Sequence, residues 1–237
     1  MKEILAHIEM KKQEFAKLPL FEYMRDTSID PRQRLAWTPC AAPFAMGFAE
    51  LNKNVFRDNK TNDPVQKIIN QHTREDDHHW LWFLEDIKKL EMNRSLEFND
   101  ALRFLWSEET RIPRWVIYEL YRYTFEASTI QKLVVIEVIE ATGHVLSSIA
   151  VSVSQELKKT NNKNLLYFGD VHLSVENGHV IGLSEINQFM EEIEFTQENI
   201  NYYLGLAENI FDLFTELTNS LLLYAQTHKI DKFAKSA

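Results

Sequence analysis

The stretch LLYFGDVHLSVENGHVIG, residues 165–182, decides how the rest of the chain is interpreted. Within it, His172, Glu176 and His179 follow one another at spacings of four and three residues. On an α-helix these steps keep the three side chains within a sector of roughly 60°. Two imidazoles and one carboxylate on one helical face are half of a site for a first-row transition metal. The stretch therefore predicts a metal-binding helix.

The same spacing occurs a second time, on an earlier segment. His72, Asp76 and His79 again lie four and then three residues apart. They interrupt an apolar stripe, and buried polar groups are costly unless they are paired or bound. The segment opens with Asp-Pro, a signal for a helix start. We therefore expect one long helix over residues 63–91 that carries the second triplet.

A third segment, KLVVIEVIEATGHVLSSIAVSV at residues 132–153, is apolar on every side and predicts a buried helix. Nevertheless, Glu137, Glu140 and His144 share one of its faces. No Lys or Arg follows Lys132 until Lys158, so these carboxylates have no counter-charge on their own helix. Such groups are protonated, paired with another helix, or bound to a metal.

Helical periodicity also covers residues 2–18, 100–106, 113–126 and 196–228. Gly and Pro number only 6 each, which suits long helices and few turns. We expect one all-α domain over residues 1–237, with seven to nine helices around a buried dimetal site.

Composition excludes several classes of function. The net charge of −9 argues against binding to nucleic acid or to an anionic membrane. Cys40 is the only cysteine, so the chain has no internal disulfide and no thiolate cluster. The N-terminus lacks the pattern of a signal peptide, and no apolar run approaches the roughly 18 residues of a membrane span. We expect a cytoplasmic protein, with a homodimer as the default assembly.

Imidazoles and carboxylates from facing helices are how carboxylate-bridged pairs of irons are held in a bundle. The alternative is a non-enzymatic binding protein in which these side chains form only a buried hydrogen-bonded network. The HExxH and GxSxG signatures of zinc proteases and serine hydrolases are absent.

Three segments together resemble the haem-oxygenase-like diiron oxidases and oxygenases: INQHTREDDHHWLWFLEDIKKL, VIEVIEATGHV and YFGDVHLSVENGH. The similarity runs over roughly residues 35–225 in order and spacing. It implies a haem-oxygenase-like helical bundle that holds two Fe²⁺ ions and takes O2 as co-substrate. The metal ligands it implies are His72, Asp76, His79, Glu140, His172, Glu176 and His179.

Two positions in this assignment stay open. The bridging glutamate of the family falls most naturally on Glu140, with Glu137 as the second choice. Many members carry a glutamate seven residues before the histidine that matches His79, and here that position is His72. Either His72 is a ligand itself, or Asp76 or Glu75 supplies the carboxylate.

The resemblance implies O2-dependent oxidation of a small amino-acid substrate, with His79, Glu140 and His172 at the reacting centre. Length and motif spacing are most similar to nitrile-forming members, which convert a tryptophan, preferably the 5-bromo compound, to an indole-3-carbonitrile. The candidate substrate-binding residues are Trp80, Phe104, Arg111 and Tyr167.

Among these, Arg111 is a possible guanidinium clamp for a carboxylate, and a solvated surface arginine is the alternative. A metal-free enzyme on the same scaffold, of the thiaminase or quinone-cofactor-oxidase type, is a further alternative. The thiaminase type needs a cysteine nucleophile, and Cys40 would have to fill that role.

Overall fold

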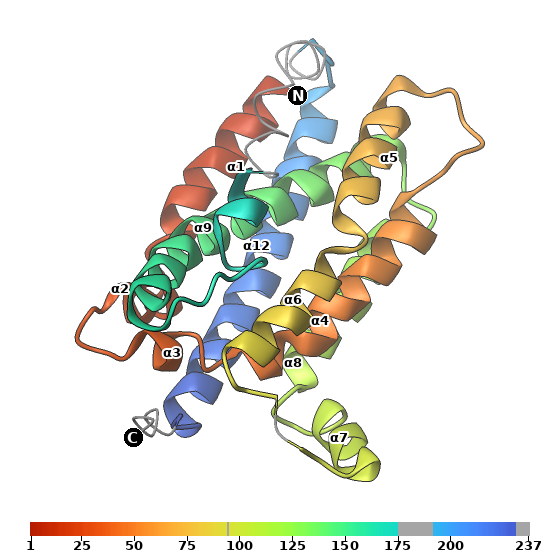
Figure 1. The fold of residues 1–237 in the computed structure, drawn as a ribbon. Helices are drawn as coiled ribbons and strands as arrows, with labels where there is room; N and C mark the ends of the chain where they lie inside the picture. Colours follow the sequence, from red (N-terminus) through yellow and green to blue (C-terminus); the bar gives the residue numbers. More distant parts are fainter. Residues whose placement is uncertain (94, 175–191, 231–237) are drawn as a thin grey trace, which may run out of the picture.

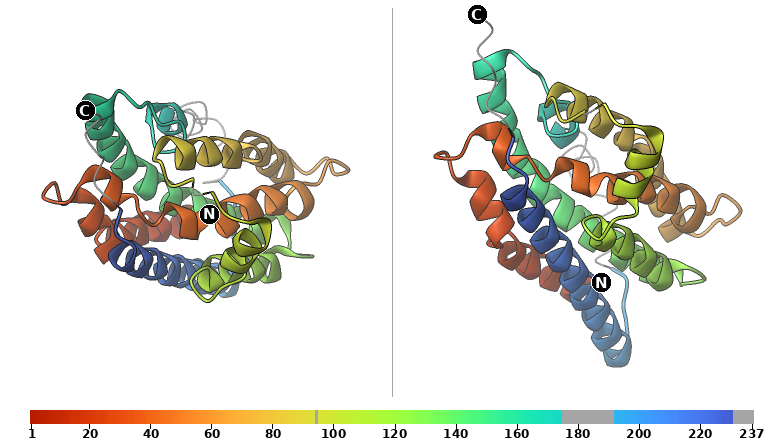
Figure 2. Two further views of the ribbon diagram at one scale, coloured as in Figure 1. Left: turned by 60° about the horizontal axis from the view of Figure 1, so that its bottom comes forward. Right: turned by 90° about the horizontal axis from the view of Figure 1, so that it is seen from below.

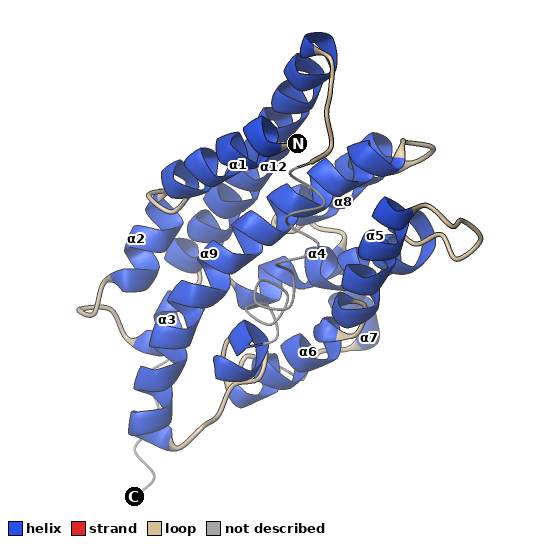
Figure 3. Ribbon diagram, turned by 90° about the horizontal axis from the view of Figure 1, so that it is seen from above, coloured by secondary structure: helices blue, strands red, loops and turns tan. Residues whose placement is uncertain are grey.

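The computed structural model describes residues 1–93, 95–174 and 192–230, and all regular structure within them is helical (Figure 3). The helices are α1 (Lys2–Phe15), α2 (Pro19–Arg25), α3 (Pro31–Arg34), α4 (Thr38–Leu51), η1 (Asn52–Phe56), α5 (Pro64–Asp76), α6 (His79–Lys89), α7 (Phe98–Leu105), α8 (Arg111–Thr124), α9 (Thr129–Asn161) and α12 (Gln197–Thr227). A further helical turn covers residues 170–174. The all-α prediction is confirmed.

The described residues contain ten α-helices, so the predicted number of seven to nine is too low. One reason is a short separate helix, α2, after the first one. Pro19 begins it, because a proline at the first position of a helix loses no hydrogen bond.

Four helices begin at a side-chain cap, and the predicted start at Asp63 is one of them. The side chains of Asp63, Ser128 and Thr196 accept hydrogen bonds from backbone N–H groups in the first turns of α5, α9 and α12. Asp30 does the same for α3. Each cap satisfies a donor that the helix itself leaves without a partner.

The expected single helix over residues 63–91 is wrong, because it breaks between Asp76 and His79 into α5 and α6. Arg57 lies at the break and donates 2.7 Å hydrogen bonds to the carbonyl of Thr73 and to the carboxylate of Asp77. In a continuous helix the Thr73 carbonyl would accept from the backbone N–H of Asp77 instead. The guanidinium of Arg57 thus takes the place of a helical hydrogen bond.

Helix α9 crosses the middle of the bundle (Figure 1). It contacts α1, α2 and α12 on one side and α5 and α8 elsewhere along its length. Two further views show α1 and α12 side by side, away from α5 and α6 (Figure 2). Leu133, Val138 and Val153 of α9 are completely buried, which confirms the predicted core helix.

By length and composition alone, α9 could also cross a membrane, which was not expected from the sequence. However, 67% of its most apolar stretch is buried by the other helices. The core helix of a globular bundle has the same composition, since it needs apolar residues on all sides.

Candidate metal centre

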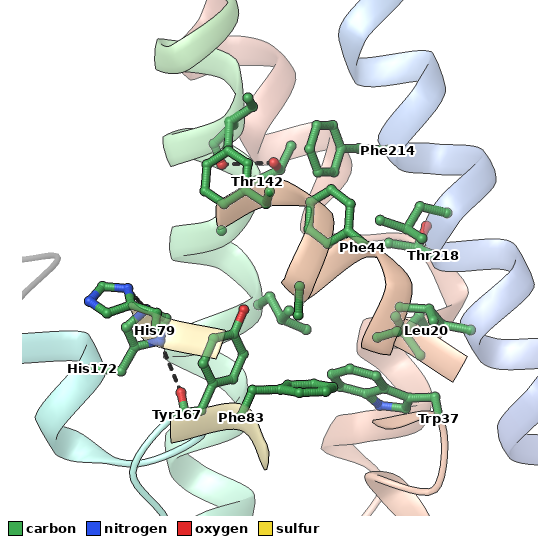
Figure 4. Close-up of a pocket in the computed structure, with 18 of the residues that line it drawn as sticks. Leu20, Trp37, Phe44, His79, Phe83, Thr142, Tyr167, His172, Phe214 and Thr218 are labelled. Carbon is green, nitrogen blue, oxygen red and sulfur yellow. Dashed lines mark hydrogen bonds between the residues drawn. The ribbon is translucent and has the colours of Figure 1, made fainter. Parts of the chain in front are cut away.

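Two histidines that are far apart in the sequence meet inside the bundle. His79 is the first residue of α6, and His172 lies in the helical turn at residues 170–174. Both side chains are buried, and Nδ1 of His79 lies 3.1 Å from Nε2 of His172. Figure 4 shows the pair at one side of a cavity. One histidine from each predicted triplet therefore reaches the same place.

A backbone carbonyl orients the ring of His172. Nδ1 of His172 lies 2.9 Å from the carbonyl oxygen of Tyr167 (Figure 4). Because a carbonyl oxygen only accepts hydrogen bonds, Nδ1 carries the proton, and in the neutral tautomer the lone pair lies on Nε2, facing His79. Histidines that bind metals are usually oriented by such a hydrogen bond from the other ring nitrogen.

Two carboxylates reach the same cavity. Asp76 is the last residue of α5, and its Oδ1 lies 3.5 Å from Nδ1 of His79. Glu140 of α9 lines the cavity as well, next to Gly143. Four of the seven predicted ligands thus surround one space, and they come from α5 and α6, from α9, and from the turn at residues 170–174.

The other candidates on α5 do not line the cavity. His72 is buried but lies outside the cavity wall. Glu75 also lies outside it and accepts a hydrogen bond from Gln71. Of these three residues, Asp76 is therefore the one that lines the cavity together with His79. Glu176 and His179 lie in residues 175–191, outside the described part of the chain.

The structure separates the two glutamates of α9. Glu140 lines the cavity, whereas Glu137, one turn earlier, does not. Burial raises the pKa of Glu137 to about 7, because a charged carboxylate is poorly solvated there. Glu140 is thus the better placed of the two for the bridging role.

Within the described ranges, no three His, Cys, Asp or Glu side chains are grouped so that they could hold a metal ion. Asp76, His79 and His172 lie close together but do not form such a group. There the two ring nitrogens point at each other, and the carboxylate flanks one of them.

The cavity has a volume of about 120 Å³, well above the roughly 10–15 Å³ that holds one water molecule. His79, His172 and Asp76 lie together at one side of it, and Glu140 also lines it. The rest of its wall is mostly apolar and comes from α1, α2, α4, α6, α9 and α12 (Figure 4). This part includes Phe21, Trp37, Phe44, Phe83, Phe214 and Leu217.

Two of the four predicted substrate-binding residues line this cavity, namely Trp80 and Tyr167. The other two do not. Phe104 packs against Tyr224 with ring centroids 6.3 Å apart, which attaches α7 to α12. Arg111 is exposed and pairs with Glu108 at 3.0 Å. The predicted guanidinium clamp is therefore not part of this cavity, and the alternative of a solvated arginine describes Arg111 better.

Among the described residues, neither Lys nor Arg lines the cavity. The segment 175–191 contains neither residue in its sequence. A ligand carboxylate buried among the apolar residues would therefore meet no counter-charge, at a cost of several kcal/mol. The cavity suits a molecule with one polar end and an uncharged, apolar body.

No protein-family model matches the chain, and no curated protein matches it. The function is therefore inferred from the geometry of the cavity and its ligands.

Asp86 is a residue of this site that the sequence reasoning missed. It is completely buried on α6 and accepts hydrogen bonds from the backbone N–H groups of Leu166 and Phe168, on either side of Tyr167. Its spacing was the available signal, because Asp86 lies seven residues after His79 and so faces inward with it.

Proposed function

We propose that the chain is a non-haem diiron oxygenase with a haem-oxygenase-like fold, which uses O2 to oxidise a small amino-acid substrate. One observation carries this proposal: His79 and His172 make contact, and both line one cavity together with Asp76 and Glu140. Imidazoles and carboxylates from several helices of a bundle are part of the ligand set that two irons require.

The donor set fits the proposed metals chemically. It offers two imidazoles and two carboxylates, and His172 already has its proton on the nitrogen that faces the Tyr167 carbonyl. Asp76, His79, Glu140 and His172 would hold the ions, and Glu176 and His179 are expected to complete the set. Two ferrous ions would supply the electrons and open coordination positions that O2 activation needs.

The protein's own part is to bind the substrate, orient it and exclude water. Aromatic walls such as Phe44 and Phe214 favour a flat ring in the apolar part of the cavity. The amino group of the substrate would then lie at the side of the cavity that holds His79, His172 and Asp76. This placement suits an indole side chain, in keeping with the resemblance to the nitrile-forming tryptophan enzyme of the cyanobacterial aetokthonotoxin pathway.

A metal-free role for the histidines is the second candidate. It is favoured by the direct contact of 3.1 Å between His79 and His172, which is a normal hydrogen-bond distance. In that case the two histidines belong only to a buried hydrogen-bond network.

A cysteine-based mechanism has less support. The thiol of Cys40 donates a hydrogen bond to the carbonyl of Glu109 and does not line the cavity. Burial raises the pKa of Cys40 to about 12, so the reactive thiolate is scarcely populated at neutral pH.

The deciding experiment is anaerobic loading of the purified protein with Fe(II), followed by O2, with and without tryptophan or 5-bromotryptophan. We expect about two irons per chain and O2 consumption that is stimulated by the substrate. Bound iron should also stabilise the native state against heat, because it binds the native state more tightly than the unfolded one.

Absence of both bound iron and thermal stabilisation would refute the diiron proposal and favour the hydrogen-bond network. Bound iron without consumption of O2 on any indole substrate would keep the metal centre and refute the substrate assignment.

A further inference from the structure

Two threonines that line the cavity offer hydrogen-bond acceptors to a ligand. Thr142 lies on α9 and Thr218 on α12, and both residues are buried. Each hydroxyl donates its hydrogen at 2.9 Å to a carbonyl oxygen of its own helix, that of Ile139 for Thr142 and that of Thr215 for Thr218. A hydroxyl has one hydrogen and two acceptor lone pairs. Both hydroxyls can therefore only accept a further hydrogen bond.

The acceptor capacity of these hydroxyls is unused within residues 1–93, 95–174 and 192–230. In these ranges, Thr142 and Thr218 make the two side-chain hydrogen bonds given above and no others. A ligand N–H group in the cavity can therefore be paired by a threonine. Such pairing matters, because a buried N–H group without an acceptor is unfavourable.

The ring N–H of an indole is a donor that needs such a partner. In the proposed function, the imidazoles and carboxylates of the cavity are occupied by the metal ions. Trp80 cannot accept either, because its side chain has only an N–H to offer. The side-chain acceptors left in the described part of the cavity wall are the hydroxyls of Thr142, Thr218 and Tyr167.

Thr142 is the best placed of these three residues. It shares α9 with Glu140, and on an α-helix the Cα atoms of residues two positions apart are separated by about 5.5 Å. The amino nitrogen and the ring nitrogen of tryptophan are a similar distance apart. A substrate whose amino group meets the metal centre therefore places its ring nitrogen within reach of Thr142.

The other two hydroxyls are less well placed. Figure 4 shows Thr218 across the cavity from His79 and His172, and its helix, α12, supplies none of the predicted metal ligands. The ring of Tyr167 stacks on the ring of His172 with centroids 4.6 Å apart, so the Tyr167 side chain flanks the metal centre itself.

The cavity wall beside Thr142 suits a flat ring. Gly143 follows Thr142 and also lines the cavity. Because it has no side chain, a ligand can lie close to the backbone of α9 there. Phe44 and Phe214 line the same cavity and pack edge to face, with ring centroids 5.7 Å apart.

We propose, on the basis of the diiron function above, that Thr142 selects the substrate by accepting a hydrogen bond from the ring N–H of an indole. The hydroxyl hydrogen of Thr142 stays on the carbonyl of Ile139. The cavity then favours an aromatic ring that carries an N–H group over a ring of the same size that lacks one.

Two ligands of nearly equal size test this selection. They are L-tryptophan and 3-benzothienylalanine, in which a ring sulfur replaces the N–H group. Isothermal titration calorimetry measures their binding to the chain with a chelator and after anaerobic loading with Fe(II). The ratio of the two dissociation constants gives the discrimination. Thr142→Val removes the hydroxyl at nearly constant size, and Thr142→Ser keeps it.

We expect the wild type to favour tryptophan, and Thr142→Val to lower the discrimination about three- to tenfold, the effect of one hydrogen bond. Thr142→Ser should keep the wild-type ratio. Thr124→Val is the matched control, because Thr124 is also buried and donates its hydroxyl hydrogen to the carbonyl of Leu120, but does not line the cavity. A general loss of structure would weaken the binding of both ligands alike, so the ratio separates recognition from folding.

Equal binding of the two ligands by the wild type would overturn the proposal, as would an unchanged ratio in Thr142→Val. Discrimination that is lost in Thr218→Val or Tyr167→Phe instead would assign the N–H group to that hydroxyl and also overturn it. Absence of binding of either ligand in both metal states would have the same result.

Two further outcomes separate this proposal from the diiron function. Discrimination by Thr142 in a chain that binds no iron would keep the role of Thr142 and refute the diiron function. Bound iron with O2 consumption that both ligands stimulate equally would keep the diiron function and refute the role of Thr142.

Discussion

Asp86 on α6 accepts a 2.8 Å hydrogen bond from the backbone N–H of Leu166, a residue 80 positions further along the chain. A second bond of 3.0 Å, from the N–H of Phe168, completes this anchor. The loop is tight, because a Cβ on Gly169 would lie 2.1 Å from the carbonyl oxygen of Leu165. Between the two anchored residues lies Tyr167, whose carbonyl orients His172. Asp86 therefore positions a predicted metal ligand without touching it.

Replacement of this anchor should weaken both the fold and the metal centre. Asp86→Ala leaves two backbone N–H groups without their acceptor, at about 1–3 kcal/mol each. We expect a loss of about 3 kcal/mol in urea unfolding and less iron per folded chain. Asp86→Asn keeps one acceptor oxygen, so its stability and iron content should lie between those of the wild type and of Asp86→Ala. Normal iron content in folded Asp86→Ala would show that the anchor is only structural.

Alanine substitution of His78 and of His79, which are adjacent at the break between α5 and α6, should have very different effects on activity. His79→Ala removes a predicted ligand, and we expect it to abolish iron-dependent O2 consumption while the helix content stays unchanged. His78→Ala is the matched control, because the side chain of His78 is 50% exposed. Bound iron is measured for both variants, and their O2 consumption is measured with an oxygen electrode. Equal activity of the two variants would count against His79 as a ligand.

Glu137 should make the stability of the metal-free protein depend on pH. Its pKa is raised from 4.5 to about 7, so the folded state holds a proton that the unfolded state releases. The free energy of unfolding is therefore not reduced by Glu137 below pH 4.5, and it falls by up to about 3 kcal/mol as the pH rises to about 7.

Glu137→Gln cannot ionise and should therefore be more stable than the wild type at pH 8, with little difference at pH 4. Urea unfolding with a chelator at both pH values measures the effect. Glu85→Gln, at an exposed position of α6, is the control and should change neither value. A wild-type stability that does not fall between pH 4.5 and 7 would contradict the assignment.

Two helical glycines should respond to alanine with opposite signs. At Gly47 an added Cβ would lie 2.9 Å from Cγ1 of Ile117, so α4 and α8 would have to separate slightly. Gly47→Ala should destabilise the fold by about 1–3 kcal/mol. At Gly205 nothing lies within 4 Å, and alanine should stabilise α12 by up to about 1 kcal/mol. Thermal melts of both variants decide this, and a stabilising Gly47→Ala would contradict the close packing.

The sequence predicted the features that depend on local pattern. The helix start at Asp63 was predictable because capping needs only a short polar side chain before a helix. The meeting of His79 with His172 was expected from the resemblance to diiron proteins together with the identical spacing of the two triplets.

The features that failed depend on contacts from distant segments. The break between α5 and α6 involves Arg57, which no periodicity in residues 63–91 reveals. Arg111 was placed at the site because arginine suits a carboxylate, but its helix turns that side chain to solvent beside Glu108. A side chain's type predicted its chemistry here, and tertiary packing decided its location.

The 93 residues that separate His79 from His172 also bear on how the protein folds. Helices such as α9 can form from contacts between near neighbours, within microseconds. The two imidazoles meet only after a long loop has closed, which is entropically unfavourable until the surrounding helices have docked. We therefore expect the metal centre to assemble late in folding. Iron would then bind only after the helical bundle has formed, and it would not initiate folding.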